Sequence, residues 1–186
     1  MDIAIENILK KVVKRALDLY LNSNTILNID NESFDNEFLK NKFGVFIEIV
    51  DQNESITALG NIENDINILD NIIFVLINTI KTLDTENIEK LKNNQLNIRL
   101  WIVESYTNLK NQTEREKTYS ISANKPAILI NKNNTNYYCY LPSIWEEQND
   151  PIYILENLAL NAGLDKDEWK NINLDLITFN PILITI

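Results

Sequence analysis

The stretch FGVFIEIVDQNESITALG, residues 43–60, decides which kind of fold the chain can adopt. Residues 43–50 are rich in β-branched and aromatic side chains, a composition typical of a β-strand. Residues 51–54 are polar and predict a hairpin turn. Residues 55–59 predict a second strand, which ends at Gly60. The stretch therefore predicts two neighbouring antiparallel strands.

Amphipathic helices are predicted before and after this hairpin in the sequence. Residues 6–21 and 65–83 place apolar side chains at three- and four-residue steps, the period of a helix with one core-facing side. The β-branched residues of 65–83 lower its helix propensity, so a buried strand is the alternative there. Residues 22–41 are polar and predict a loop with short structure, in which Phe34 and Phe38 can hold a segment against the core.

The second half of the chain predicts shorter elements. Residues 85–92 indicate a short helix, and residues 108–117 indicate a polar connector. Residues 96–104 predict a strand, because apolar residues alternate along it on one side. Its other side also carries apolar side chains, so both faces are expected to be partly covered. The expected strands are residues 96–104, 118–122, 127–130 and 137–141, followed over residues 174–186 by one strand or by a pair broken at Pro181.

One helix in the last third carries its own start and stop signals. Asp150 is placed to cap its first turn, and Pro151 occupies the first helical position. Gly163 is suited to close it in the left-handed conformation. Asp165 then predicts a further turn with Glu168 as its capping partner. Helices interleaved with hairpins indicate a single α+β domain over residues 1–186, with antiparallel sheets and helices packed on their faces.

The composition limits where the protein acts and what it binds. Hydrophobic residues make up 45% of the 186, enough for a sizeable core, and the net charge of −10 disfavours a nucleic-acid partner. The chain opens on an acidic segment without the basic region of an export signal. Its longest apolar stretch, residues 66–83, is interrupted by polar side chains and is too short to span a membrane. A cytoplasmic location is predicted.

Several kinds of chemistry are excluded by residues that the sequence lacks. It has no histidine, so Ser-His-Asp and Cys-His pairs and histidine-ligated metals are excluded. The single cysteine, Cys139, cannot form a Cys-rich metal site, and three glycines cannot form a glycine-rich phosphate loop. No cofactor and no metal is predicted. Carboxylate chemistry, a lysine or tyrosine acid or base, an oxygen-ligated ion, or no chemistry at all remain open.

A family resemblance rests on motifs in the last third of the chain. They are the turn within residues 138–143, Glu147, the helix end that begins at Asn161, and Trp169. Together they resemble the AMMECR-type domain family, in which an L-L-P turn is followed by a glutamate, a helix ending in K-A-G-L and a tryptophan about five residues later. Asn161 replaces the lysine of that pattern. Residues 43–46 are also similar to the family's G-V-F-V strand.

The chain departs from this family at its most distinctive motif. Residues 55–60 stand where the family has L-R-G-C-I-G, and only Gly60 is kept. Ile56 replaces the arginine, Thr57 the inner glycine and Ala58 the cysteine. A second motif, D-x-R-F, is not recognisable after the long helix. Any chemistry that these residues perform in the family is therefore not expected here.

The resemblance implies two lobes around a cleft and a place in a modification system, because such domains occur beside or fused to Memo-type and radical-SAM proteins. We therefore predict a non-catalytic binding or scaffold protein with one of these as partner. The alternative is an enzyme with a carboxylate-based cleft site, for which Glu147 is a weak candidate base. The predicted cleft residues are Ala58, Gly60, Trp145 and Glu147.

Other residues have two interpretations each. Cys139 is a reactive thiol or, as favoured, a small buried hydrophobe. The carboxylates at 165, 167 and 168 are cation ligands or, as favoured, charges at a helix start. Trp145 lines a binding surface or, together with Trp169, packs the last helix onto the sheet. Gly60 is favoured as a structural residue at a turn or close contact.

Overall fold

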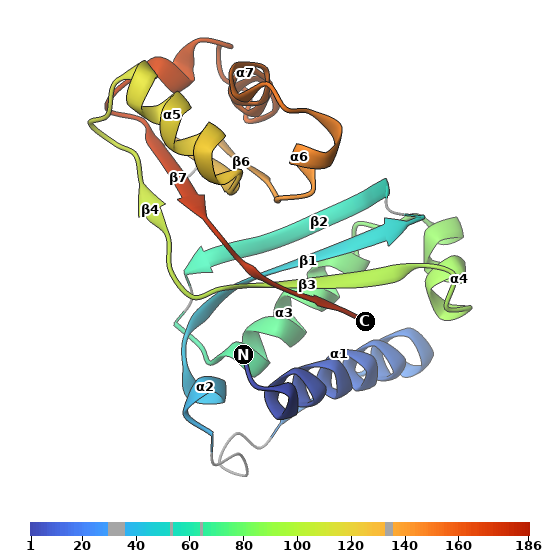
Figure 1. Ribbon diagram of the computed structural model, residues 1–186. Coiled ribbons are helices and arrows are strands. Elements are labelled where there is room, and N and C mark those ends of the chain that lie inside the picture. The colour runs from blue at the N-terminus through green and yellow to red at the C-terminus, as the bar shows by residue number, and fades with distance from the viewer. Residues whose placement is uncertain (30–35, 53, 64, 133–135) are drawn as a thin grey trace. The chain divides into compact units, whose positions relative to one another are not determined.

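The computed structural model describes residues 1–29, 36–52, 54–63, 65–132 and 136–186. The described chain forms two compact units, residues 1–104 with 182–186 and residues 105–181 (Figure 1). Each unit is built on a four-stranded antiparallel sheet with helices. The predicted α+β class with antiparallel sheets is confirmed. None of the described helices is long and apolar enough to cross a membrane.

The sheet of the first unit confirms the hairpin and adds two distant strands. Its order is β2 (Glu54–Glu63), β1 (Phe43–Asp51), β3 (Asn97–Val103) and β8 (Ile182–Thr185), all antiparallel. β2 is longer than predicted and continues past Gly60. β8 reaches this sheet only after the chain has formed the whole second unit. The expected turn position 53 lies outside the described residues.

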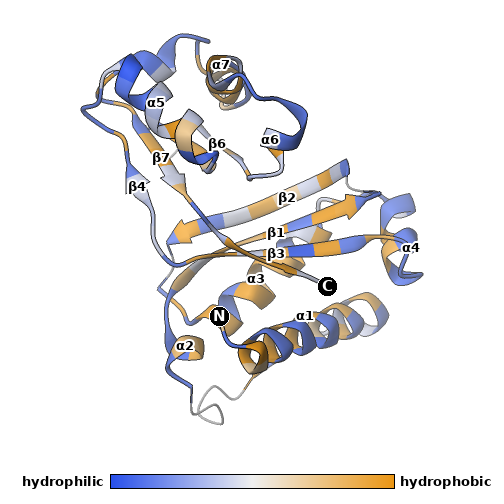
Figure 2. Ribbon diagram, viewed as in Figure 1, coloured by the Kyte–Doolittle hydropathy of each residue, from blue (hydrophilic) through white to orange (hydrophobic). Residues whose placement is uncertain are grey.

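Three predicted helices of the first unit are confirmed: α1 (Ile3–Ser23), α3 (Ile68–Ile80) and α4 (Thr85–Lys92). α1 and α3 pack on the same side of the sheet (Figure 1), and their apolar residues share one core with β1 and β3. α3 is a helix despite its β-branched residues because it is buried on most of its circumference, so packing outweighs propensity. Figure 2 shows it as largely hydrophobic with hydrophilic interruptions, since its sequence includes Asp70, Asn71 and Asn78.

The polar segment before the hairpin contains the short helix α2 (Glu37–Lys40). Its Phe38 packs against the core, with ring centroids 5.0 Å from those of Phe43. The expectation that Phe38 holds this segment is confirmed. Phe34, the other residue named for this role, lies outside the described residues.

Asn71 of α3 ties the helix to the hairpin. Its side chain is fully buried, and Nδ2 donates hydrogen bonds to the Phe43 carbonyl at 2.9 Å and to Asn61 Oδ1 at 3.1 Å. Asn61 Nδ2 donates back to Asn71 Oδ1 at 3.0 Å. A buried amide is stable only when its groups are satisfied, so these bonds select one register of α3 on the sheet.

The second unit has its own sheet, in the order β4-β7-β5-β6. The strands are β4 (Thr107–Asn108), β7 (Asp175–Phe179), β5 (Ala127–Lys132) and β6 (Asn136–Tyr140). The predicted strands at 127–130 and 137–141 are thereby confirmed. The tail forms two strands that flank Pro181, as one of the two expectations had it, but β7 and β8 belong to different sheets.

The helices of the second unit contain one correction. The strand predicted at residues 118–122 is wrong, because this segment and the end of the predicted connector form α5 (Glu114–Asn124). Thr113 and Glu116 make a reciprocal capping box that starts the helix. The alternation of residues 118–122 suggested a strand, in which Tyr119 and Ile121 would point to the same face. In the structure, Tyr119 is 74% exposed whereas Ile121 is fully buried.

The helix that begins at Pro151 is confirmed together with its signals. α7 (Pro151–Asn161) is capped by Asp150, whose Oδ1 accepts from the Ile152 amide at 2.9 Å. Gly163 has φ 73°, and the chain then enters the 3₁₀ turn η2 (Glu168–Lys170). The Glu168 carboxylate accepts from Lys132 and Asn171 instead of serving the predicted cap. α6 (Ile144–Glu147) precedes α7.

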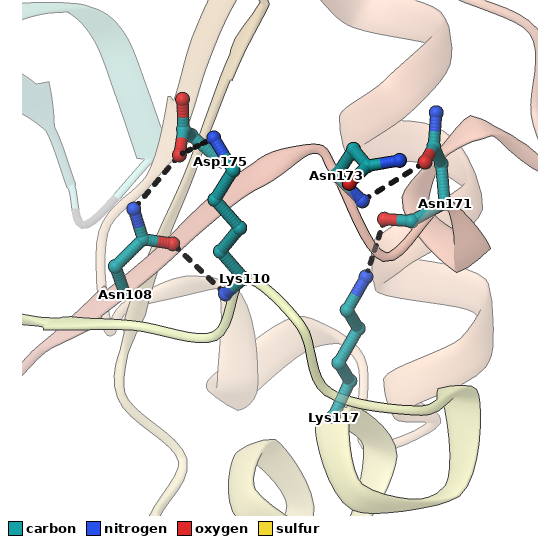
Figure 3. A network of polar contacts seen from close by, with 6 residues as sticks. All are labelled: Asn108, Lys110, Lys117, Asn171, Asn173 and Asp175. Carbon is teal, nitrogen blue, oxygen red and sulfur yellow. Dashed lines mark hydrogen bonds and ion pairs between the residues drawn. The ribbon is translucent and has the colours of Figure 1, made fainter.

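Lys117 is a buried clamp inside the second unit (Figure 3). It is fully buried on α5, and its Nζ donates to the carbonyls of Trp169 and Asn171, each at 2.8 Å. Burial lowers the pKa of this amine below its ordinary value. Lys110 in the same view is exposed and pairs with Asp175 at 3.2 Å. The two lysines therefore differ in burial, and Figure 3 shows them in two separate groups of polar contacts.

Replacing Lys117 with methionine tests this clamp. We expect Lys117→Met to lower the free energy of unfolding by about 2 kcal/mol, because two buried carbonyls lose a charged donor. The matched control Lys110→Met removes an exposed ion pair and should cost less than about 1 kcal/mol. Urea denaturation of both variants measures the difference. Equal losses in the two variants would contradict the clamp.

Candidate functional site

The four predicted cleft residues fall in two units. Ala58 and Gly60 lie on β2 of the first unit, whereas Trp145 and Glu147 lie on α6 of the second. Each pair is described within its own unit below. The cleft predicted between the pairs stays a prediction.

Gly60 occupies a position that has no room for a side chain. A Cβ built there would lie 2.3 Å from the Val45 carbonyl oxygen and 2.4 Å from the Phe46 ring, both on the neighbouring strand. Contacts this short are not tolerated without movement of the backbone. The close approach of β1 and β2 thus accounts for the one residue that the chain keeps from the family's motif.

Ala58 is exposed and lies opposite Glu48 in the β1–β2 register. Side chains directly opposite each other on antiparallel strands point to the same face. Where the family has a cysteine, this chain therefore presents a methyl group on the face that carries Glu48.

A buried polar group that the sequence reasoning missed occupies the same face. The Glu48 cluster consists of Glu48, Arg99 and Trp101. Glu48 is 1% exposed, and its Oε2 accepts a hydrogen bond from Trp101 Nε1 at 3.1 Å and lies 3.6 Å from a guanidinium nitrogen of Arg99. Arg99 is the register partner of Glu48 across β1 and β3. Burying a carboxylate is tolerated because it is paired in this way.

The sequence contained a signal for this cluster. Glu48 is the single charged residue within the apolar run of residues 43–50. Strand alternation puts it on the side of Phe46 and Val50, which are both buried, and not on a solvated face. A charge at such a position requires a partner, and the partner comes from a strand about fifty residues later.

Trp145 is a buried residue of the second unit. It is 6% exposed, and its Nε1 donates to the Pro126 carbonyl at 2.8 Å. Trp145 and Trp169 share a core with the inward face of α7, including Leu155 and Leu158. This packing agrees with the interpretation that the two tryptophans hold α7 on its sheet.

Glu147 lies at the exposed end of α6, near a group of phenols. Burial raises the pKa of Tyr140 above its ordinary value, as do Tyr138 and, more weakly, the charges of Tyr153 and Glu147. A hydrogen bond of 2.7 Å from Asn161 Nδ2 to the Tyr140 hydroxyl opposes this. The residue that replaces the family's lysine thus serves as a neutral donor to this tyrosine.

The remaining candidate groups lack the geometry of a reactive site. Cys139 is half-buried on β6, and burial raises the pKa of its thiol, which keeps it protonated. Asp167 pairs with Lys170 and Glu168 with Lys132, each at 2.9 Å, and these contacts lower the pKa of both carboxyls. Within the described parts of the chain, no three acidic or cysteine side chains are grouped to hold a metal.

The Glu48 cluster leads to a stability prediction. Arg99→Met leaves the Glu48 carboxylate buried without its cation, so the free energy of unfolding should fall by about 3 kcal/mol. Arg15→Met, at an exposed position of α1, is the control and should change it by less than about 0.5 kcal/mol.

The double variant Glu48→Gln/Arg99→Met separates lost charge pairing from lost packing. It should be more stable than Arg99→Met alone, because no charge is then left buried. Thermal and urea unfolding of the wild type, the single variants Glu48→Gln and Arg99→Met, and the double variant provide the measurement. A double variant as unstable as the sum of its parts would show that the two side chains are not coupled.

Comparisons with known proteins agree with the fold and the motifs described above. The AMMECR1 family model matches residues 10–183. A crystal structure of the uncharacterized protein PH0010 from Pyrococcus horikoshii is similar, with a TM-score of 0.77 and 17% sequence identity over 95% of this chain and 88% of that one. No curated protein matches the sequence. The family match spans nearly the whole described chain, and the protein therefore belongs to the AMMECR1 family.

Proposed function

We propose that this protein is a non-catalytic binding component of a cytoplasmic modification system, with a Memo-type or radical-SAM protein as its partner. Family membership is the starting point of the proposal. The class of partner follows from the proteins beside which such domains occur.

The observation that carries the proposal is the state of residues 55–60. Each side chain that replaces the family's signature has a packing role or is inert. Ile56 packs against the core of the first unit, and the Thr57 hydroxyl lies 2.9 Å from that of Thr82. Ala58 offers no nucleophile. The segment is thus built for stability and carries no reactive group of its own.

The local geometry explains how Ile56 reaches the core. The register of β1 and β2 shifts between Ile49 and Val50, because Thr57 pairs with the first and Ser55 with the second. Ile56 is the extra residue of this β-bulge, and bulges re-aim a side chain. The side chain at the position where the family has an arginine therefore packs against the hydrophobic core.

An accessible edge also supports binding. β2 is the edge strand of its sheet, and Ser55, Ala58 and Leu59 are exposed on it. Edge strands offer backbone donors and acceptors to a partner chain. A protein that lost its reactive side chains here can still present this strand to another protein.

The alternative function, an enzyme with a carboxylate-based site, has one observation in its favour. Glu147 and Tyr153 both lie close enough to Tyr140 for their charges to act on its phenol. Carboxylate and phenol groups near each other are a common acid–base arrangement. The experiment below separates this alternative from the binding proposal.

The test is a pull-down of the tagged protein from its native cell, followed by mass spectrometry and by titration against the purified partner. We expect stoichiometric recovery of a Memo-type or radical-SAM protein. Ala58→Arg should weaken the measured affinity at least about 10-fold, because a bulky charge blocks the β2 edge. Ala123→Arg, at an exposed site on α5, is the matched control and should bind normally.

Glu147→Ala distinguishes the two functions. The binding proposal expects unchanged recovery of the partner and unchanged complementation of a deletion strain. A folded Glu147→Ala protein that binds its partner but fails in the cell would favour the enzyme. Circular dichroism and the unfolding midpoint establish that the variant is folded.

A further inference from the structure

The second unit contains a pocket of about 290 Å³ that none of the predicted site residues lines. It lies where the connector before α5 passes the end of β7. The connector contributes five lining residues, and Ser120 and Asn124 of α5 contribute two more. Pro126 and the residues from Thr178 to Asn180, at the end of β7, complete the lining. The five connector residues are Ser105, Tyr106, Thr107, Leu109 and Gln112. All of its lining residues belong to this one unit.

The backbone around this pocket is held by regular hydrogen bonds. Thr107 pairs with Thr178 in the β4–β7 ladder, and the Leu109 amide donates to the Leu176 carbonyl at 2.7 Å. The capping box of Thr113 and Glu116 then fixes the start of α5. The polar network of Asn108, Lys110 and Asp175 secures the outer side of the same connector (Figure 3). The walls are therefore preformed, as in most small-molecule sites.

The lining is polar and carries no acidic or basic side chain. It combines serine and threonine hydroxyls and the Tyr106 phenol with three side-chain amides. Pro126 and the buried residues Leu109 and Phe179 supply its apolar part. The amides are those of Gln112, Asn124 and Asn180. A charged ligand would lose its hydration there without gaining an opposite charge. A neutral ligand with several hydrogen-bonding groups meets partners that match it.

One lining residue has an unmet hydrogen-bonding requirement. The Oε1 atom of Gln112 is buried and accepts no hydrogen bond from the residues that the structure describes. A buried acceptor left in this state costs about 1–3 kcal/mol. The other lining amides are exposed. Because Oε1 itself is covered, the Gln112 side chain has to rotate toward the pocket before a bound donor can satisfy it.

We propose that this pocket binds a small uncharged polar molecule, of the size of a monosaccharide or a nucleobase, that donates a hydrogen bond to Gln112. At about 30 Å³ for each water, 290 Å³ holds roughly ten non-hydrogen atoms. This activity is distinct from partner binding at the β2 edge, because the pocket lies in the other unit. It makes the protein a sensor or carrier of a small molecule.

Three matched pairs of probes test the proposal on the full chain. Ribose, glucose and uracil are the neutral members, and ribose 5-phosphate, glucuronate and orotate are their charged counterparts. Amide chemical shifts are followed by two-dimensional NMR during titration. We expect at least one neutral probe to shift the amides of residues 105–112 and 178–180, with its charged counterpart at least about 10-fold weaker. Binding of ribose or glucose would indicate a monosaccharide as the ligand, and binding of uracil would indicate a nucleobase.

A variant pair ties the binding to Gln112. Gln112→Leu keeps the approximate shape and removes the acceptor, so the affinity for the binding probe should fall at least about 5-fold. Ser122→Ala changes an exposed hydroxyl of α5 outside the pocket and should leave it unchanged.

The folding of the same variant provides an independent readout. Gln112→Leu should unfold at the same or a higher urea concentration than the wild type, because a buried unsatisfied acceptor is lost. The proposal is overturned if no neutral probe binds at 20 mM (about the weakest affinity such a site would have), if charged and neutral probes bind alike, or if the folded Gln112→Leu variant binds as tightly as the wild type.

Discussion

Seven consecutive residues of β1, from Gly44 to Val50, are buried, and this burial sets the requirements that the first unit meets. A strand covered on both faces tolerates few polar groups and little variation in volume. Glu48 is accommodated because Arg99 and Trp101 reach it from the neighbouring strand. Gly60 is retained because β2 approaches the same strand too closely for a side chain. The helices α1 and α3, which pack on one side of the sheet, supply the apolar side chains that cover that face of β1.

The burial of β1 also restricts which side chains fit at residues 55–60, where the family has its signature motif. Residues 55–60 lie on β2, directly beside the buried strand, so their side chains must be compatible with its packing. Replacement of arginine by Ile56 and of cysteine by Ala58 makes the segment more apolar and less reactive. The family model nevertheless matches residues 10–183, and the fold is similar to that of PH0010.

The second unit has its own hydrophobic core, and polar contacts between a connector, α5 and the turn at η2 add to it. Lys117 is buried to hold two carbonyls, and the capping box orders the start of its helix. Gln112 Oε1 and Trp169 Nε1 are the two buried side-chain atoms without a hydrogen-bond partner among the described residues. Of the two, only Gln112 lines the pocket, and buried polar groups are usually satisfied, so this one is informative.

The sequence by itself determined the elements whose signals are local. The hairpin at residues 43–60, α1, α3 and the capped helix α7 follow from periodicity and from Asp150, Pro151 and Gly163. The family resemblance likewise rested on short local motifs, chiefly the turn within residues 138–143, Glu147, the helix end at Asn161 and Trp169. Local patterns specify an element because the dihedral angles and the capping bonds involve residues close together in the chain.

Only the tertiary structure decided which distant segments meet. Residues 118–122 alternate like a strand, but Lys117 and Ile121 are buried on one side of a helix by contacts with segments far along the chain. Residues around Pro181 separate into strands of two different sheets. The partners of Glu48 and the pocket beside Gln112 are equally invisible in the sequence. Strand pairing and burial depend on contacts across many residues, and no short-range pattern encodes them.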